Sequence, residues 1–235
     1  PFEFPAYGAD GFTDMSFKNW NDLDGKLVVG SITEFNKLLS ESPALVKKLR
    51  SAFGRKGGLD LVSGGPPCQS FSMAGKREKD NNKNTLPWEF AKFVEHTQPK
   101  IALLENVTGI LRPFKDSEGK QFHAWYEVAK VFATIGYVPL CLHINARQAG
   151  VPQNRPRFIM IAVRFNHIKS AIKKLDNQSK DLFIQPLDFY EKVQIKKADL
   201  EFGHLTVLDS NKSSGLSLFK SSFLAPLVSV KEEVS

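Results

Sequence analysis

Cys68 stands in a stretch whose neighbours restrict its backbone. It lies in GGPPCQSFS (64–72), at the end of the predicted strand LDLVSGG (59–65). The two glycines allow backbone conformations that other residues avoid, and the two prolines stiffen the chain just before the cysteine. A cysteine held rigidly at the end of a strand suits a nucleophile. The alternative is a structural cysteine buried in a tight turn.

Glu105 directly follows the apolar run IALL (101–104) and precedes Asn106. A carboxyl group this close to a buried strand is expected to be poorly solvated, and burial raises the pKa of a carboxyl group. A raised pKa would let Glu105 hold or donate a proton near neutral pH. The alternative is an ordinary carboxylate in a loop or at a helix N-terminus.

Arg155 and Arg157 lie in the turn-rich stretch ARQAGVPQNRPRF (146–158), which leads into another apolar run. Strand-like alternation predicts that the two side chains point to the same side. Paired guanidinium groups bind phosphate, carboxylate or carbonyl oxygens. The alternative is a solvated basic loop.

Each of these three segments follows a predicted strand. Apolar runs and helical spacing of apolar residues predict five strands, at 27–32, 59–65, 100–106, 137–145 and 158–163, and three helices, at 43–53, 86–97 and 120–135. Alternating strands and helices are typical of an α/β fold with a doubly wound, mostly parallel, Rossmann-like sheet. Ligands bind such sheets at the carboxyl ends of the strands, where all three segments lie.

The regular pattern weakens after about residue 165. We therefore predict a catalytic domain over residues 1–165 and a short, irregular C-terminal segment over residues 166–235, which is rich in lysine and serine. This segment is a candidate part of a target-recognition region.

The composition is that of an ordinary globular protein, with 42% apolar and 24% charged residues. The formal charge of +7 favours a polyanionic partner. Two cysteines indicate a reducing compartment rather than a disulfide framework, and the scattered histidines predict no metal site. The absence of a long apolar run predicts a soluble, intracellular protein that does not enter a membrane.

Taken together, the three segments resemble motifs of the C5-cytosine DNA methyltransferase family. GPPCQSFSMAGK (65–76) is similar to its PCQ motif, LLENV (103–107) to its ENV motif and AGVPQNRPRF (149–158) to its QxRxR motif. NTLPWEFAKFVEHTQPK (84–100) is similar to the helix that the family has between the first two. The resemblance runs along residues 30–163.

The resemblance implies a methyltransferase that uses S-adenosylmethionine and acts on cytosine flipped out of double-stranded DNA. The thiolate of Cys68 would add to C6 of the base, while Glu105 would hold the proton at N3. C5 would then accept the methyl group. Arg155 and Arg157 would contact the cytosine carbonyl oxygen and the DNA backbone, or order the catalytic loop.

The resemblance also implies further site residues. On the DNA side these are Gln69, Ser70, Ser72, Lys76, Asn106 and Gln153. Asn106 would position Pro67 or the cysteine loop. On the cofactor side they are Ser31, Ile32, Pro67 and Leu86. Ser31 stands where the family has an aspartate, so its contact with the cofactor would be weaker.

Two motifs of the family are not recognisable in this sequence. PFEFPAYGADGF (1–12) lacks the glycine-rich F-x-G-x-G-G pattern, and the C-terminal glycine-asparagine motif is missing. We therefore expect a missing segment or a second subunit to supply them. The implied location is the bacterial cytoplasm, at the nucleoid, as for a restriction-modification enzyme, or the nucleus of a eukaryote.

Other functions stay open at this point. One branch of the family methylates tRNA, and the missing motifs also fit a non-catalytic module that binds DNA or a partner chain. A cysteine hydrolase would need a histidine beside Cys68, and the other two strand-end segments contain none.

Overall fold

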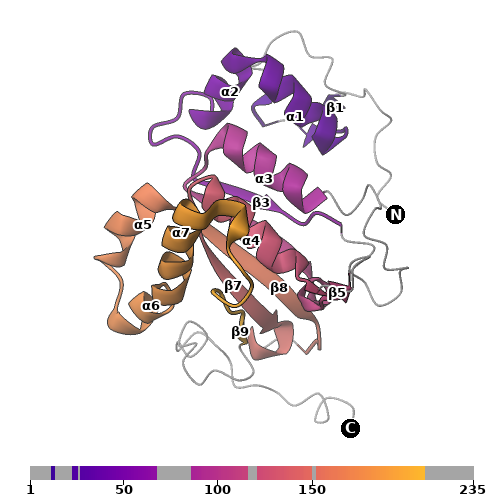
Figure 1. Cartoon of the computed structure of the whole chain (residues 1–235). Coiled ribbons are helices and arrows are strands. Elements are labelled where there is room, and N and C mark those ends of the chain that lie inside the picture. Colours follow the sequence, from indigo (N-terminus) through magenta and orange to yellow (C-terminus); the bar gives the residue numbers. More distant parts are fainter. Residues whose placement is uncertain are drawn as a thin grey trace.

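The structure, a computed structural model, describes residues 12–13, 23–25, 27–67, 86–115, 121–149 and 152–209. Its centre is a five-stranded sheet in the order β3-β4-β8-β7-β9 (Figure 1). The strands are β3 (Leu61–Gly64), β4 (Ile101–Val107), β7 (Tyr137–Asn145), β8 (Pro156–Arg164) and β9 (Leu208–Asp209).

Four of these strands run in the same direction. β3 pairs with β4 in parallel, β7 pairs with β9 in parallel, and β8 lies antiparallel between β4 and β7. The connection from β7 to β8 contains no crossover helix, which is why these two strands are antiparallel. The mostly parallel α/β fold predicted from the sequence is confirmed.

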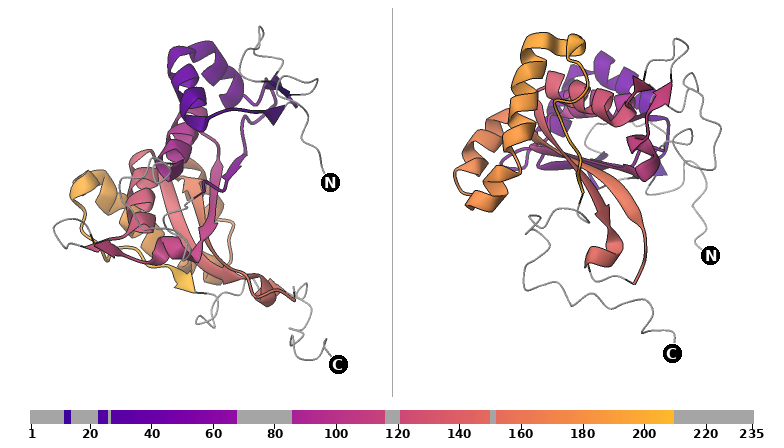
Figure 2. Two further views of the ribbon diagram at one scale, coloured as in Figure 1. Left: turned by 90° about the vertical axis from the view of Figure 1, so that its right-hand side faces the viewer. Right: turned by 60° about the horizontal axis from the view of Figure 1, so that its bottom comes forward.

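Three helices cover one face of the sheet, as the right-hand view of Figure 2 shows. They are α3 (Leu86–Thr97), α4 (Ala124–Thr134) and α7 (Ile184–Lys196). α4 buries Trp125, Ala129 and Phe132 on one stripe, as its helical spacing predicts. Together with the inward side chains of the sheet, these helices form the main hydrophobic core.

The opposite face of the sheet carries a smaller apolar cluster centred on Leu140 and Leu142, with Ile159 and Ile161 packed against it. Glu105 pairs in register with Ile159, and residues on one strand alternate between faces. Glu105 and Arg157 therefore emerge on this second face, away from the main core.

A third cluster lies beneath the N-terminal helices α1 (Ile32–Glu41) and α2 (Pro43–Arg50). Leu23, Leu39 and Leu45 are its buried members, and Phe93 of α3 packs against it. The short parallel strands β1 (Phe12–Thr13) and β2 (Leu27–Val28) form a separate two-stranded sheet.

Two predictions for the N-terminal part were wrong in detail. The strand expected at 27–32 ends at Val28, and helix α1 begins at Ile32, because Phe35, Leu38 and Leu39 recur at helical spacing. The helix expected at 43–53 ends at Arg50, because the turn that follows it has positive φ angles at Ala52 (47°) and Phe53 (58°).

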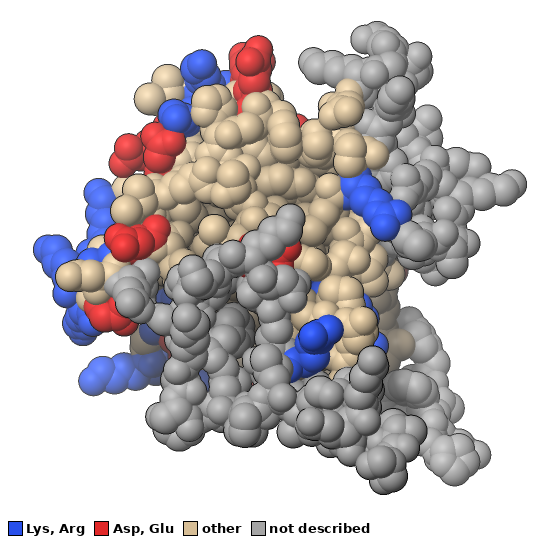
Figure 3. Space-filling model, turned by 90° about the horizontal axis from the view of Figure 1, so that it is seen from below, with Lys and Arg blue, Asp and Glu red and all other residues tan. Residues whose placement is uncertain are grey.

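The chain from 165 to 209 is more regular than its composition predicted. It contains α5 (Phe165–Ile172), α6 (Asn177–Asp181), α7 and β9. Phe189 and Val193 of α7 are fully buried in the main core. The lysines of this region concealed the pattern, because Lys169, Lys173 and Lys174 are exposed. In Figure 3, Lys and Arg gather at the left edge, the side on which α5 and α6 lie in Figure 1.

The remaining described elements are short. They are β5 (Phe114–Lys115), β6 (Gln121–Phe122), η4 (Thr108–Leu111), η5 (Ala146–Ala149) and η6 (Lys197–Asp199). The helix predicted over 120–135 begins only at Ala124, since 121–122 pair with 114–115. Within the described residues no helix is both long and apolar enough to span a membrane.

Candidate active site and cofactor pocket

The predicted chemical segments meet at one edge of the sheet. β3 ends at Gly64, β4 at Val107 and β7 at Asn145, and these three strands run in the same direction. Their carboxyl ends therefore lie at the same edge, where antiparallel β8 begins. Cys68, Gln69, Ser70, Ser72 and Lys76 lie outside the described residues, so the nucleophile and the predicted DNA-binding loop stay predictions.

Asn106 anchors the chain that leads to Cys68. Its Nδ2 donates a hydrogen bond to the carbonyl oxygen of Pro66 at 3.1 Å, and its Oδ1 accepts one from the backbone N–H of Val107 at 2.9 Å. The side chain is buried, with the residue 3% exposed. Asn106 was expected to position Pro67 or the cysteine loop, and the described contact is with Pro66, the residue before Pro67.

Glu105 and Arg157 form an ion pair, with Nε of Arg157 2.8 Å from Oε1 of Glu105. Nη1 of Arg157 donates a hydrogen bond to the carbonyl oxygen of Pro156 at 2.9 Å. Its buried Nε–H makes no aligned hydrogen bond among the described residues, so the contact with Glu105 is electrostatic. The strand register brings the two side chains together, because Arg157 pairs with Val107, two residues beyond Glu105.

Glu105 is better solvated than the sequence predicted. Its side chain is 41% exposed, compared with 22% for Arg157. The carboxylate emerges on the face of the sheet opposite α3, α4 and α7, so the helices that bury the main core do not cover it. Its second oxygen lies against Gly65, where an added Cβ would be 3.2 Å from Oε2. A glycine at 65 therefore leaves room for the carboxylate.

Arg155 differs from Arg157 in its surroundings. β8 begins at Pro156, so strand alternation does not determine where the Arg155 side chain points. Arg155 and Gln153 are exposed, and no side-chain hydrogen bond or ion pair of Arg155 is found within the described residues. The structure thus brings Arg157, but not Arg155, into contact with Glu105.

Sequence reasoning missed Asn145, the last residue of β7. Its side chain accepts hydrogen bonds from the backbone N–H groups of Arg147 and Arg155, both at 3.2 Å, and donates one to Asn154 at 2.7 Å. A polar residue directly after the apolar run of a strand was the available signal.

An apolar pocket of about 340 Å³ lies between the third cluster and the start of α1. Of the four predicted cofactor residues, Ser31 and Ile32 border this pocket, whereas Pro67 and Leu86 do not. The cofactor role of all four residues stays a prediction. The other lining residues are Leu23, Val28, Gly30, Phe35, Leu49, Phe53 and Phe93. The rings of Phe35 and Phe93 lie 5.9 Å apart.

The volume and the lining of the pocket are those of a small ligand site. Ligand sites start at roughly 300 Å³ and combine apolar and aromatic walls with a few polar groups. Its polar groups include Ser31, whose side chain makes no capping hydrogen bond at the start of α1. The pocket therefore suits a flat, weakly polar ring with a hydrogen-bonding edge.

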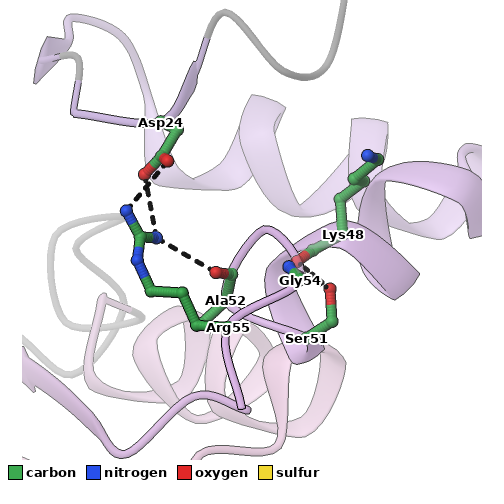
Figure 4. A network of polar contacts seen from close by, with 6 residues as sticks. All are labelled: Asp24, Lys48, Ser51, Ala52, Gly54 and Arg55. Atoms are coloured by element: carbon green, nitrogen blue, oxygen red, sulfur yellow. Dashed lines mark hydrogen bonds and ion pairs between the residues drawn. The ribbon is translucent and has the colours of Figure 1, made fainter.

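Polar contacts connect two segments that contribute residues to this pocket, and Figure 4 shows these contacts. Arg55 makes two hydrogen bonds to the carboxylate of Asp24, at 3.0 and 2.9 Å, and a third to the carbonyl oxygen of Ala52 at 3.0 Å. Ser51 donates to the carbonyl oxygen of Lys48 and accepts from the N–H of Gly54. The contacts join the turn after α2, which carries Phe53, to residues 23–25, which carry Leu23.

Cys141 is not a candidate nucleophile. It is fully buried in the main core, and burial raises the pKa of its thiol. Because the thiolate is the reactive form, Cys141 is a structural cysteine.

The family model for C-5 cytosine-specific DNA methylase matches residues 26–219. The chain therefore belongs to the C-5 cytosine-specific DNA methylase family.

Two curated relatives and one solved structure are similar to parts of this chain. The chain is 32% identical over 185 residues to type II methyltransferase M.AquIA of Picosynechococcus sp., covering 74% of this chain and 70% of the relative. It is 42% identical over 106 residues to type II methyltransferase M1.HphI of Haemophilus parahaemolyticus, covering 44% and 27%. The solved S. pombe Dnmt2 methyltransferase is 23% identical, with a TM-score of 0.36 and coverage of 62% and 38%.

The matches cover only part of several relatives. The chain spans 27% of M1.HphI, 25% of M.DdeI of Desulfomicrobium norvegicum and 35% of the orphan methyltransferase M.SPRI of Bacillus phage SPR. It thus spans about a quarter to a third of the length of these curated relatives.

Proposed function

We propose that this chain carries the catalytic motifs of a DNA cytosine-5 methyltransferase of the bacterial modification type, acting on double-stranded DNA. The observation that carries the proposal is the common edge of β3, β4 and β7. There the chain leading to Cys68 is tied to Asn106, and Glu105 is paired with Arg157. Two relatives named type II methyltransferases support the bacterial type.

Cys68 is the proposed nucleophile. Its thiolate adds to C6 of a flipped cytosine and forms a C6–S bond, while the electron pair of C5=C6 moves into C4=C5 and that of C4=N3 moves onto N3. C5 thereby becomes the carbon of an enamine. A thiolate suits this step because it is a strong nucleophile and also a workable leaving group.

Glu105 is proposed to hold the proton at N3, where electron density accumulates during the addition. A proton held there stabilises the transition state more than the ground state. In the structure Glu105 forms an ion pair with Arg157. A bound cytosine would therefore displace Arg157 from Glu105 or contact both side chains. Arg157, once next to the base, can donate to the carbonyl oxygen of cytosine.

The cofactor proposed for the apolar pocket is S-adenosylmethionine, which supplies an electrophilic methyl group to C5 when it is bound. Ile32 and the rings of Phe35 and Phe93 would contact its base, and Ser31 would accept or donate at the polar edge. After methylation, loss of the C5 proton to a solvent base reforms C5=C6, and the C6–S electron pair returns to Cys68.

DNA contacts are proposed for the polar residues beside the site. Base flipping costs a few kcal/mol, which contacts to the displaced strand must offset. Gln69, Ser70, Ser72 and Lys76 follow the nucleophile in sequence, and Gln153 and the exposed Arg155 lie on the neighbouring loop. The positive charge of the chain favours the phosphate backbone.

The test is covalent trapping with duplex DNA that contains 5-fluorocytosine. Fluorine at C5 cannot leave as a proton, so the enzyme stays attached to the base when S-adenosylmethionine is present. We expect a denaturation-resistant protein–DNA complex with the wild-type chain and none with Cys68→Ser. Transfer RNA that contains the same base analogue is the competing substrate.

Cys141 provides a matched control, because it is the second of the two cysteines in the chain. Cys141→Ala removes a buried thiol from the core and should keep the complex. Loss of the complex in Cys141→Ala with retention in Cys68→Ser would overturn the assignment of the nucleophile.

A further inference from the structure

The connection between β7 and β8 is held by one buried amide. Asn145 is 8% exposed, and its Oδ1 accepts hydrogen bonds from the backbone N–H groups of Arg147 and Arg155. Its Nδ2 donates to Oδ1 of Asn154 at 2.7 Å. The same side chain therefore contacts the beginning and the end of the loop over residues 146–155.

Further backbone contacts are described at the two ends of this loop. The N–H of Ala146 donates to the carbonyl oxygen of Arg155 at 3.4 Å, and the N–H of Arg155 also donates to Gln153 at 3.1 Å. Asn145 pairs in register with Pro156, the first residue of β8. The position of the Asn145 side chain thus sets the backbone position of Arg155. It also affects Arg157, which is the second residue of β8.

We propose that Asn145 is a positioning residue that sets the loop backbone for Arg155 and Arg157. This proposal rests on the proposed methyltransferase function. Asn145 acts through the two arginines and is not itself expected to contact DNA or cofactor. Its effect on the reaction follows from the placement of their guanidinium groups, because small displacements of catalytic groups are costly.

The chemistry of the side chain explains why an asparagine stands here. Its oxygen accepts two hydrogen bonds and its nitrogen donates one. Aspartate keeps the two acceptor contacts, and Asn154 could turn its amide to donate. Leucine has a similar shape but accepts nothing, so the N–H of Arg147 loses the acceptor at Asn145 and the N–H of Arg155 keeps only the carbonyl oxygen of Gln153. The loop must then rearrange to expose the N–H of Arg147.

The first experiment measures amide exchange by NMR in the full chain. In Asn145→Leu the N–H of Arg147 should lose its protection, whereas Asn145→Asp and the control Asn154→Ala should keep it. Arg147 is the better reporter, because the N–H of Arg155 also has Gln153 as an acceptor. This readout does not depend on catalysis. If Asn145→Leu does not fold, Asn145→Ala, which leaves space for water, takes its place.

The second experiment measures the rate of adduct formation with 5-fluorocytosine DNA in a double-mutant cycle. Asn145→Leu should slow the adduct by about 100-fold, as expected for a misplaced catalytic group. Asn145→Asp should stay within about threefold of the wild type, since the acceptor contacts remain. In an Arg155→Ala background the further effect of Asn145→Leu should shrink, because the two residues act as one unit.

Two results would overturn the positioning role. One is unchanged exchange at Arg147 in Asn145→Leu, and the other is a full, independent effect of Asn145→Leu in the Arg155→Ala background. Failure of the proposed function looks different. The wild-type chain would then form no adduct, while the exchange data would still decide whether Asn145 holds the loop.

Discussion

The main core and the third cluster beneath α1 and α2 are built differently. The main core fills the space between the sheet and α3, α4 and α7, and its large aromatic residues Tyr126, Phe132 and Phe158 are at most 1% exposed. Among the described residues the third cluster has three buried members, and it borders a pocket of about 340 Å³. One cluster is closed by side chains, and the other leaves room for a ligand.

Polar contacts in the two places serve different ends. In the main core the hydroxyl of Tyr137 donates to the carbonyl oxygen of Pro99 at 2.7 Å, and burial raises the pKa of this tyrosine to about 12. Near the third cluster Asn36 of α1 donates to the carboxylate of Glu89 at 2.8 Å and to its carbonyl oxygen at 2.9 Å. The Tyr137 hydrogen bond satisfies a polar group within the main core, whereas the Asn36 hydrogen bonds attach α1, which borders the pocket, to α3.

The largest effect is expected in the main core. Phe132→Ala removes a fully buried ring that contacts Phe90 and Tyr137. The lost burial and the cavity should lower the free energy of unfolding by about 3–5 kcal/mol, measured by urea titration. Ile195→Ala, at an 81% exposed position, is the control and should change it by less than about 0.5 kcal/mol. Equal losses in the two variants would contradict the comparison.

A smaller loss of stability is expected beside the pocket. Phe93 is partly buried and borders the cavity, so Phe93→Ala should cost about 2 kcal/mol, less than a fully buried ring. Phe93→Ala should weaken ligand binding more than Phe132→Ala does. Calorimetry with S-adenosylhomocysteine should show at least about tenfold weaker binding. Equal affinity for the two variants would mean that the pocket does not hold the cofactor.

The contact between α1 and α3 should depend on pH through Glu89. Burial alone would raise the pKa of this carboxyl group, but hydrogen bonds from Lys92 and Asn36 outweigh it, so the pKa lies below its ordinary value of 4.5. A lowered pKa in the folded state adds stability above the ordinary value, and this stability is lost as the pH falls through the folded pKa. Glu89→Gln should therefore cost about 1 kcal/mol near neutral pH.

Thermal unfolding at several pH values checks this prediction. The difference between the wild type and Glu89→Gln should narrow as the pH falls below 4.5. Glu95→Gln, an exposed change on the same helix, should follow the wild type throughout. A difference that stays constant from neutral to acid pH would show that the charge of Glu89 does not stabilise the fold.

Local signals in the sequence predicted the main scaffold well. The helix expected at 86–97 and the strand expected at 137–145 have the observed bounds, because Pro87 stands in the first turn of α3 and Gly136, with a φ of 95°, ends the helix before β7. Helix α1 was missed because it begins within the apolar run LVVGSI (27–32), which was predicted as a strand.

The candidate site was predicted as residues but not as contacts. Glu105 and Arg157 were both named, yet their pairing depends on the antiparallel register of β4 and β8, which no local pattern contains. Asn145 was missed because the role of an asparagine at the end of a strand depends on its hydrogen bonds to the loop that follows. The burial expected for Glu105 also failed, since burial depends on which helices cover each face.

The smallest effect on stability should come from Ser31, at the polar edge of the pocket. Ser31→Asp places a carboxylate where the family has one, and the charged acceptor should bind the hydrogen-bonding edge of the nucleoside more strongly than a hydroxyl does. The affinity for S-adenosylhomocysteine should rise by up to about tenfold in calorimetry. The carboxylate also lies at the N-terminus of α1, where it should add a few tenths of a kcal/mol to stability.

Ser31→Ala is the control that separates the effect of the hydroxyl from the effect of the added charge. It removes the hydroxyl without adding charge and should leave the affinity within about threefold of the wild type. If Ser31→Asp stabilises the protein but lowers the affinity for S-adenosylhomocysteine, the carboxylate faces the helix and not the nucleoside. The pocket would then bind its ligand through the apolar walls alone.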